Sequence, residues 1–278
     1  MKTFIKWAGN KSVYASQIVS YFPSEFNTYI EPFVGSGAVL LRLMPKTWTI
    51  NDKSAYLMEI WNAARKNYDA FVKDYKILAA EFLRLSTKKD QLSFCREKTE
   101  QLKRMKNKDP KRAALYLFLK NAVYMGFLHT KMGLVFDGFD MNLYTSREPY
   151  FVSDKFLSNL KMVHDYVSSS KGKILNKDYK KVLEVAKPGD FVFLDPPYQE
   201  SHSYKFKYND NDAPLTEDFV KELLAEVKKL DARGVKWMMT QANTPLVRKT
   251  FSEYRIRAFK VYRRQSRTYK NELMIFNY

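Results

Sequence analysis

Short apolar runs alternate with segments of helical periodicity at both ends of this 278-residue chain. Near the start, an apolar strand over residues 28–33 is followed by a glycine turn, a helix over 38–43 and a second strand over 48–50 that ends at Asn51-Asp52. This is the order of a nucleotide-binding βαβ unit, so the pattern predicts an α/β fold. Further strands are predicted over residues 173–175, 191–194 and 235–240, with a closing hairpin over 254–262 and 272–278, and helices within 6–21 and over 152–168, 180–185 and 216–230.

The middle of the chain has a different pattern. Between residues 55 and 102 the apolar positions recur at helical spacing, and no alternating strand interrupts them. A second apolar helix is predicted over 113–124, and a glycine-punctuated, irregular stretch follows over 125–144. The predicted division is therefore an α/β domain over residues 1–55 and 148–278, interrupted by a mostly helical insert over residues 56–147.

Charge and composition narrow the classes of binding partner and of chemistry that the chain can have. The chain has 48 lysines and arginines against 30 acidic residues, a net charge of +18, which favours nucleic acid first and an anionic membrane surface second. A single cysteine excludes an internal disulfide and fits a reducing compartment, and three separate histidines cannot build a zinc site. There is no targeting signal, and the longest apolar run is too short to cross a bilayer. We expect a soluble, intracellular protein that uses no metal.

The strongest chemical signal is Asp195-Pro196-Pro197-Tyr198, directly after the apolar run at 191–194. The Asp195 carboxylate and the Pro196 carbonyl can both accept hydrogen bonds from an exocyclic amine, and so favour a nitrogen with a localised lone pair. The prolines fix the backbone and remove competing donors, and Tyr198 offers a flat face for an extruded base. The same tetrapeptide is also typical of a turn that ends a strand, with Tyr198 merely packing.

A second signal is the run from Glu31 to Val39, which carries Gly35 and Gly37 at a strand end, followed by Asp52. Glycines allow close approach of a ligand to the backbone, and an acid after the second strand can hold ribose hydroxyls. With two glycines only and no following lysine, a phosphate-cradling loop is disfavoured. A nucleoside cofactor without phosphate, such as S-adenosylmethionine, fits better, although any βαβ unit can contain such a turn.

Together these pieces resemble the Dam-type adenine-N6 DNA methyltransferases. The resemblance covers almost the whole chain in the right order: Phe4 to Lys11, Glu31 to Gly37, Asn51-Asp52, Glu148 to Phe151, Asp195 to Tyr198, and Glu272-Leu273. It implies a Rossmann-like, S-adenosylmethionine-dependent sheet with a helical target-recognition insert. It also implies methyl transfer to adenine N6 in flipped-out double-stranded DNA, with S-adenosylhomocysteine as product.

The resemblance also implies residue roles. Catalysis is expected at Asp195, Pro196, Pro197 and Tyr198, and cofactor binding at Trp7, Lys11, Glu31, Phe33, Gly35, Gly37, Asp52 and Asp195. Family members that read GATC carry an Asn-Gly-Leu-x-Arg stretch, whereas this chain reads Met-Gly-Phe-Leu-His-Thr over 125–130, so we expect a different target. A cognate restriction endonuclease acting on the same site is compatible with the resemblance, and the sequence is silent on oligomeric state.

DNA contacts are predicted near the closing hairpin. Residues 248–270 contain nine basic residues and one acid, and cations there would neutralise phosphates. The residues proposed to bind DNA are Arg263, Arg264, Arg267 and Lys270, all placed in the hairpin loop, and Tyr204 in the polar loop after Tyr198. A solvated basic surface and a plain surface loop are the alternatives.

Other functions stay open at this stage. The alternatives are methylation of cytosine N4 or of RNA adenine, and a DNA-binding protein that has lost activity. Aspartate at position 195 favours adenine N6 over cytosine N4. Cys95 lies on a predicted helix rather than at a strand end after proline, which excludes it as the nucleophile of a cytosine-C5 enzyme.

Overall fold

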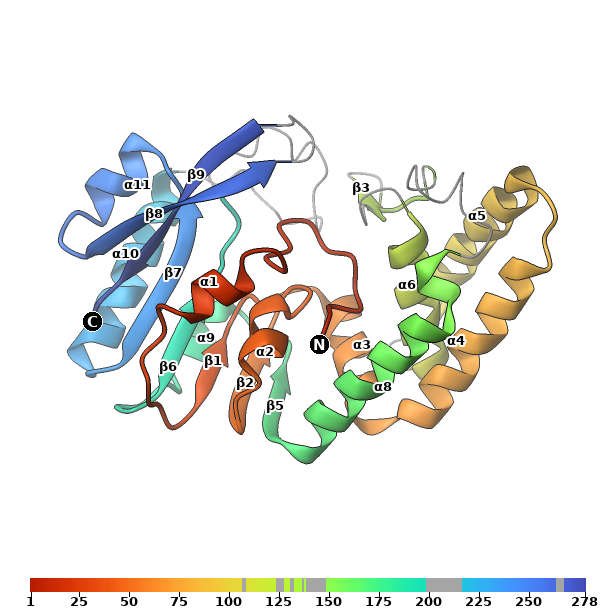
Figure 1. The fold of residues 1–278 in the computed structure, drawn as a ribbon, viewed down its shortest axis with the longest axis horizontal. Helices are drawn as coiled ribbons and strands as arrows, with labels where there is room; N and C mark the ends of the chain where they lie inside the picture. Colours follow the sequence, from red (N-terminus) through yellow and green to blue (C-terminus); the bar gives the residue numbers. More distant parts are fainter. Residues whose placement is uncertain are drawn as a thin grey trace.

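A computed structural model describes residues 1–106, 109–123, 128–130, 133–136, 138, 149–198, 217–263 and 268–278. Within these residues the architecture is a seven-stranded sheet with helices on both faces and a helical group at one side (Figure 1). The predicted Rossmann-like α/β fold is confirmed.

The strand order is β5-β2-β1-β6-β7-β9-β8. The first five strands in this order run parallel to one another, whereas β9 pairs antiparallel with both β7 and β8. The strands are β1 Tyr29–Glu31, β2 Thr47–Asn51, β5 Lys171–Leu175, β6 Phe191–Leu194, β7 Lys236–Ala242, β8 Arg255–Arg263 and β9 Thr268–Phe276. A separate two-stranded ladder joins β3 His129–Thr130 and β4 Gly133–Leu134.

Alternation along the strands produces two cores, because successive side chains of a strand point to opposite faces. On β6, Phe191 and Phe193 face one cluster with α1 and α2, whereas Val192 and Leu194 face another with α9, α10 and α11. The helices are α1 Ala15–Val19, α2 Ala38–Leu43, α3 Ala55–Lys66, α4 Tyr68–Leu83, α5 Lys88–Arg104, α6 Pro110–Ala122, α8 Asp154–Ser169, α9 Tyr179–Leu183, α10 Glu217–Ala232 and α11 Pro245–Thr250, with a 3₁₀ turn η2 Tyr150–Val152.

Helix α6 is the centre of the helical group. Asp109 caps its start, since the side chain accepts from the Lys111 amide at 2.9 Å, and Pro110 occupies the first turn. Residues 113–119 are apolar all round, as expected of a helix enclosed by other helices. Indeed α6 packs against α3, α4 and α5, beside the β5 edge of the sheet (Figure 1). One hydrophobic cluster runs from this group to the sheet, so the two share a core.

Several expectations need correction. Helix α11 and the β3–β4 ladder are absent from the prediction, whereas the turn and helix expected within residues 6–21 are present, with the helix at Ala15–Val19. Lys270 lies in β9, opposite Val261, and Arg263 ends β8, so neither is in the hairpin loop. The reason is that the β8–β9 ladder continues further toward the turn than apolar alternation indicates, because exposed polar residues also pair in it.

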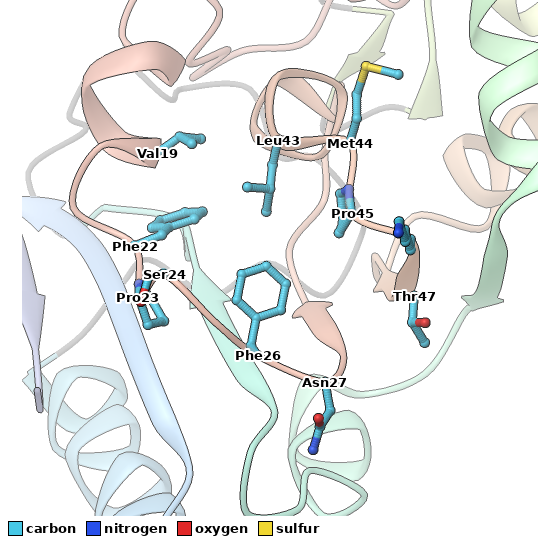
Figure 2. A pocket seen from close by; sticks show the side chains of 11 residues that line it. Val19, Phe22, Pro23, Ser24, Phe26, Asn27, Leu43, Met44, Pro45 and Thr47 are labelled. Atoms are coloured by element: carbon cyan, nitrogen blue, oxygen red, sulfur yellow. The ribbon is translucent and has the colours of Figure 1, made fainter.

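A hollow of about 500 Å³ lies at the opposite end of the sheet from the strand tips, where β1 and β2 begin. Figure 2 shows Phe22, Phe26 and Leu43 lining it. Ligands of open α/β sheets bind at the carboxyl ends of the strands, so this hollow is separate from the candidate site.

Candidate active site

The carboxyl ends of the parallel strands bring three polar side chains to one edge of the sheet. Asp52 directly follows β2, Asp195 directly follows β6, and Thr240 lies in the second half of β7. The N-terminal segment passes over this edge and brings Lys11 to it (Figure 1). Residues far apart in the chain therefore meet where the fold class places its ligands.

Asp195 is the centre of a hydrogen-bond network. Its Oδ1 accepts from the Thr240 hydroxyl at 2.6 Å and lies 2.8 Å from the Lys11 ammonium. Its Oδ2 accepts from the same ammonium at 2.9 Å. Lys11 is 7% exposed, so this ion pair is largely shielded from water. Asp195 is thereby held as a hydrogen-bond acceptor.

Tyr198 is tied to the same network from two sides. Its hydroxyl donates to Glu272 Oε2 at 2.8 Å and to Asp195 Oδ1 at 3.3 Å, and the Lys11 ammonium lies 4.7 Å from its ring centroid. Burial, followed by the nearby Asp195 and Glu272 carboxylates, holds the pKa of Tyr198 well above its usual range. The phenol is therefore neutral and its ring is fixed beside Asp195. The two prolines between them differ, since Pro196 is buried and Pro197 is exposed.

The glycine turn after β1 is built around two left-handed residues. Gly35 has φ +48° and Gly37 has φ +69°, a region that side chains rarely adopt. A Cβ at Gly35 would lie 2.9 Å from Cδ1 of Trp7, and one at Gly37 would lie 2.4 Å from Cζ2 of Trp61. Both positions therefore require glycine for conformation and for space.

Asp52 joins this turn to the start of α3. Its Oδ2 accepts from the Gly35 amide at 3.1 Å and its Oδ1 from the Ser54 amide at 3.0 Å. The residue is only partly buried, so its carboxylate can accept further hydrogen bonds from a ligand. A carboxylate, the tryptophan Trp7 and a close backbone turn fit a nucleoside cofactor that has no phosphate.

Glu31 and Phe33 lie at the end of β1 and just after it, before the glycine turn. The Glu31 carboxyl accepts from the Tyr29 hydroxyl at 2.9 Å, and burial raises its pKa well above the ordinary range. Phe33 is partly exposed and its ring lies 5.1 Å from that of Tyr179. Their predicted contact with a cofactor stays a prediction.

Some predicted residues cannot be placed. Tyr204, Arg264, Arg267, Glu148 and residues 125–127 lie outside the described residues, as does the side chain of Arg263. Lys270 is exposed on β9. Across the described ranges, no group of histidine, cysteine or acidic side chains could hold a metal ion, and no helix is long and apolar enough to cross a membrane.

Sequence reasoning did not assign roles to two residues of the network, Thr240 and Glu272. Both are polar residues in the buried parts of their strands, and each is at most 3% exposed. A buried polar side chain without a nearby sequence partner indicates a partner from another strand, because buried polar groups are hydrogen-bonded. That signal was present in both strands.

Comparison with known proteins decides the family. The model of the D12 class N6 adenine-specific DNA methyltransferases matches residues 7–268. The chain belongs to this family. Members of this class methylate adenine N6 in DNA, so the predicted activity is confirmed, and cytosine N4 and RNA adenine are set aside.

Similar curated proteins span the D12 chain almost completely. The type II methyltransferase M.MjaIII of Methanocaldococcus jannaschii is 30% identical over 87% of this chain and 84% of its own. The type II methyltransferase M1.LlaDCHI of Lactococcus lactis subsp. cremoris is 24% identical over 100% and 96%. The DNA adenine methylase of Escherichia coli K12 is 25% identical over 94% and 88%. The resemblance inferred from motifs is therefore confirmed.

Proposed function

We propose that this D12 methyltransferase uses S-adenosylmethionine to methylate an adenine flipped out of duplex DNA, with S-adenosylhomocysteine as product. The observation that supports this most directly is the position of Asp195, Pro196 and Tyr198 at the tip of β6, beside the Asp52 and Gly35 turn. A base and a cofactor bound on these two groups would share one edge of the sheet.

The base-binding half uses hydrogen-bond acceptors. Among the described residues, Asp195 Oδ2 accepts only from Lys11, so it retains a lone pair for an adenine amino group. The Pro196 carbonyl is the second acceptor. Together they draw the amino nitrogen toward a tetrahedral geometry and stabilise the positive charge that grows there. Tyr198 holds the base by stacking, with its ring fixed by Glu272.

The cofactor-binding half uses the glycine turn. S-adenosylmethionine, when bound, supplies an activated methyl group on a sulfonium. Asp52 would accept hydrogen bonds from the ribose hydroxyls, and Gly35 and Gly37 would let the methionine end approach the backbone. Trp7 would cover the bound cofactor. Lys11 forms an ion pair with Asp195 and borders both halves of the site. Glu31, at the end of β1, and Phe33, just after it, would border the cofactor on the side of the sheet.

DNA binding is proposed along the C-terminal hairpin and the insert. Lys270 is exposed on β9, and Arg263, Arg264 and Arg267 adjoin it in sequence. Tyr204 follows the base site in the chain and would contact the displaced strand. The target read by the 56–147 insert differs from GATC, because the arginine of GATC readers is missing from residues 125–130.

The cellular location and a partner endonuclease are proposed from the chemistry of the chain and from its relatives. A DNA substrate, a buried cysteine and a net charge of +18 support an intracellular enzyme, in a prokaryotic cytoplasm or in a host cell if viral. Two relatives are named type II methyltransferases, which supports a cognate endonuclease that cuts the same site.

Asp195→Ala tests the proposal. This variant should lose methyl transfer to DNA by ~10²–10³-fold, because the acceptor facing the amine is removed. Its affinity for duplex DNA should match wild type. Asp165→Ala, an exposed change on α8, is the matched control and should leave transfer unchanged.

Transfer of labelled methyl from S-adenosylmethionine and single-molecule sequencing of the product measure both activity and target. If wild-type protein binds DNA but transfers no label, the cofactor assignment is wrong. If GATC is the modified site, the interpretation of residues 125–130 is wrong.

A further inference from the structure

Lys120 is a buried lysine outside the predicted site. It lies two residues before the end of α6 and is 1% exposed, directly after the apolar residues 113–119 of that helix. Burying an ammonium is costly unless its surroundings compensate the charge. Burial lowers the pKa of Lys120 to about 7, and the nearby Asp52 partly offsets this shift. Such a residue in a helix core requires a specific reason.

The Lys120 ammonium reaches the cofactor half of the site. Its Nζ lies 4.3 Å from the ring centroid of Trp7, and 6.0 Å from that of Tyr116 one turn earlier. Trp7 in turn meets the glycine turn, since its Cδ1 lies within 2.9 Å of where a Gly35 side chain would begin. A cation over the indole therefore fixes a ring that borders the turn.

The next residue of α6 holds the same segment by its backbone. Asn121 Oδ1 accepts from the Lys6 amide at 2.9 Å, and its Nδ2 donates to the Phe4 carbonyl at 2.9 Å. The end of α6 thus holds the N-terminal motif through two backbone bonds and one ring contact. These contacts join the helical insert directly to the proposed cofactor site.

We propose that Lys120 is a positioning residue for cofactor binding, whose ammonium holds the Trp7 indole against the glycine turn beside Asp52. The inference rests on the proposed use of S-adenosylmethionine. It adds to that proposal a residue of the helical insert, acting through Trp7 rather than by touching the cofactor. In its charged form, which predominates below its pKa of about 7, a desolvated Lys120 ammonium can stabilise such an arrangement by ~2 kcal/mol through the cation–π contact, so the measurements below are made at pH 6.

A four-protein cycle tests this role: wild type, Lys120→Met, Trp7→Leu and the double variant. Isothermal titration with S-adenosylmethionine should show about tenfold weaker binding for Lys120→Met, a loss within the range of such contacts. In the Trp7→Leu background the same change should alter the dissociation constant by less than about twofold, because the ring it acts on is gone.

A purely structural lysine would behave differently. Methionine fills similar space without a buried charge, so the thermal midpoint of Lys120→Met should equal or exceed that of wild type. Lys120→Gln is a second neutral variant and should bind the cofactor as weakly. Arg65→Met is the matched control: it removes a cation 5.2 Å from the Trp48 ring, remote from the site, and should leave cofactor affinity unchanged.

Two outcomes would overturn the inference. One is wild-type affinity in both neutral Lys120 variants. The other is the same tenfold loss in the presence and absence of Trp7. Absence of S-adenosylmethionine binding by wild type would instead overturn the proposed cofactor, and this role with it.

Discussion

At the scale of single residues, the site depends on buried polar groups that hold one another. Asp195 receives donors from three parts of the chain, and Tyr198 is oriented by Glu272 from the last strand. Because the phenol pKa is raised by burial, Tyr198 remains a donor throughout the neutral and mildly alkaline range. The ring is therefore positioned by a hydrogen bond rather than by packing alone.

Glu272→Gln should therefore lower kcat by about tenfold, since hydrogen bonds to charged groups contribute ~1.5–3 kcal/mol. Tyr198→Phe removes this bond and the longer 3.3 Å bond to Asp195, so its effect should be at least as large, and the double variant should be little worse than Tyr198→Phe alone. Steady-state methylation kinetics of the four proteins measure this. Additive losses would show that Glu272 does not act through Tyr198.

Residue-level prediction from sequence proposes a candidate site where a motif is local and misses contacts between residues distant in the chain. Asp195 and Tyr198 are only three positions apart, so their proposed roles come from a run of four residues. Thr240, Glu272 and Lys120 enter the site only through strand order or helix packing, which a sequence alone does not supply. The available signal was a polar residue at the border of an apolar run, before Leu273 for Glu272 and after Met239 and Leu119 for Thr240 and Lys120.

At the scale of elements, the glycine turn between β1 and α2 determines the shape of the cofactor half. Gly37 begins α2 in a left-handed conformation, with the Trp61 indole of α3 directly against it. The strand, turn and helix here were predicted from sequence with the helix bounds reproduced, because apolar periodicity is strong over these residues. The tryptophans that enclose the turn were not predictable, since they come from other elements.

Gly37→Ala should destabilise the protein strongly. A left-handed alanine alone costs ~1–2 kcal/mol, and the added methyl would also overlap Trp61. Gly234→Ala is the matched control: Gly234 has φ +67° and open space around it, so only the conformational cost applies. Urea unfolding measures the free energy of both. Equal losses would mean that Trp61 yields to the methyl without cost.

At the scale of the whole molecule, charge governs the encounter with DNA. The excess of 18 positive charges predicts binding that weakens steeply as salt rises, because each phosphate contact releases a counterion. Lys270 and Lys236 are both exposed on strands, but Lys236 begins β7 at the end of the sheet remote from Asp195. Lys270 therefore lies at the proposed DNA interface, and Lys236 is a matched lysine remote from that interface.

Lys270→Ala should weaken binding to all DNA sequences alike and reduce the slope of log affinity against log salt by about 1. Lys236→Ala should change neither. Fluorescence anisotropy with a labelled duplex across a range of salt concentrations measures both. An unchanged slope for Lys270→Ala would move the interface away from β9.

The order in which the strands leave the ribosome differs from their order in the sheet. Strand β8 is synthesised before β9 but is joined to the sheet only through it, since β9 lies between β7 and β8. A nascent chain therefore cannot complete its sheet until β9 has emerged. Glu272 arrives on that same strand, so the Tyr198 ring lacks this hydrogen bond until β9 has emerged, and copies that stop before residue 272 should be unable to methylate DNA.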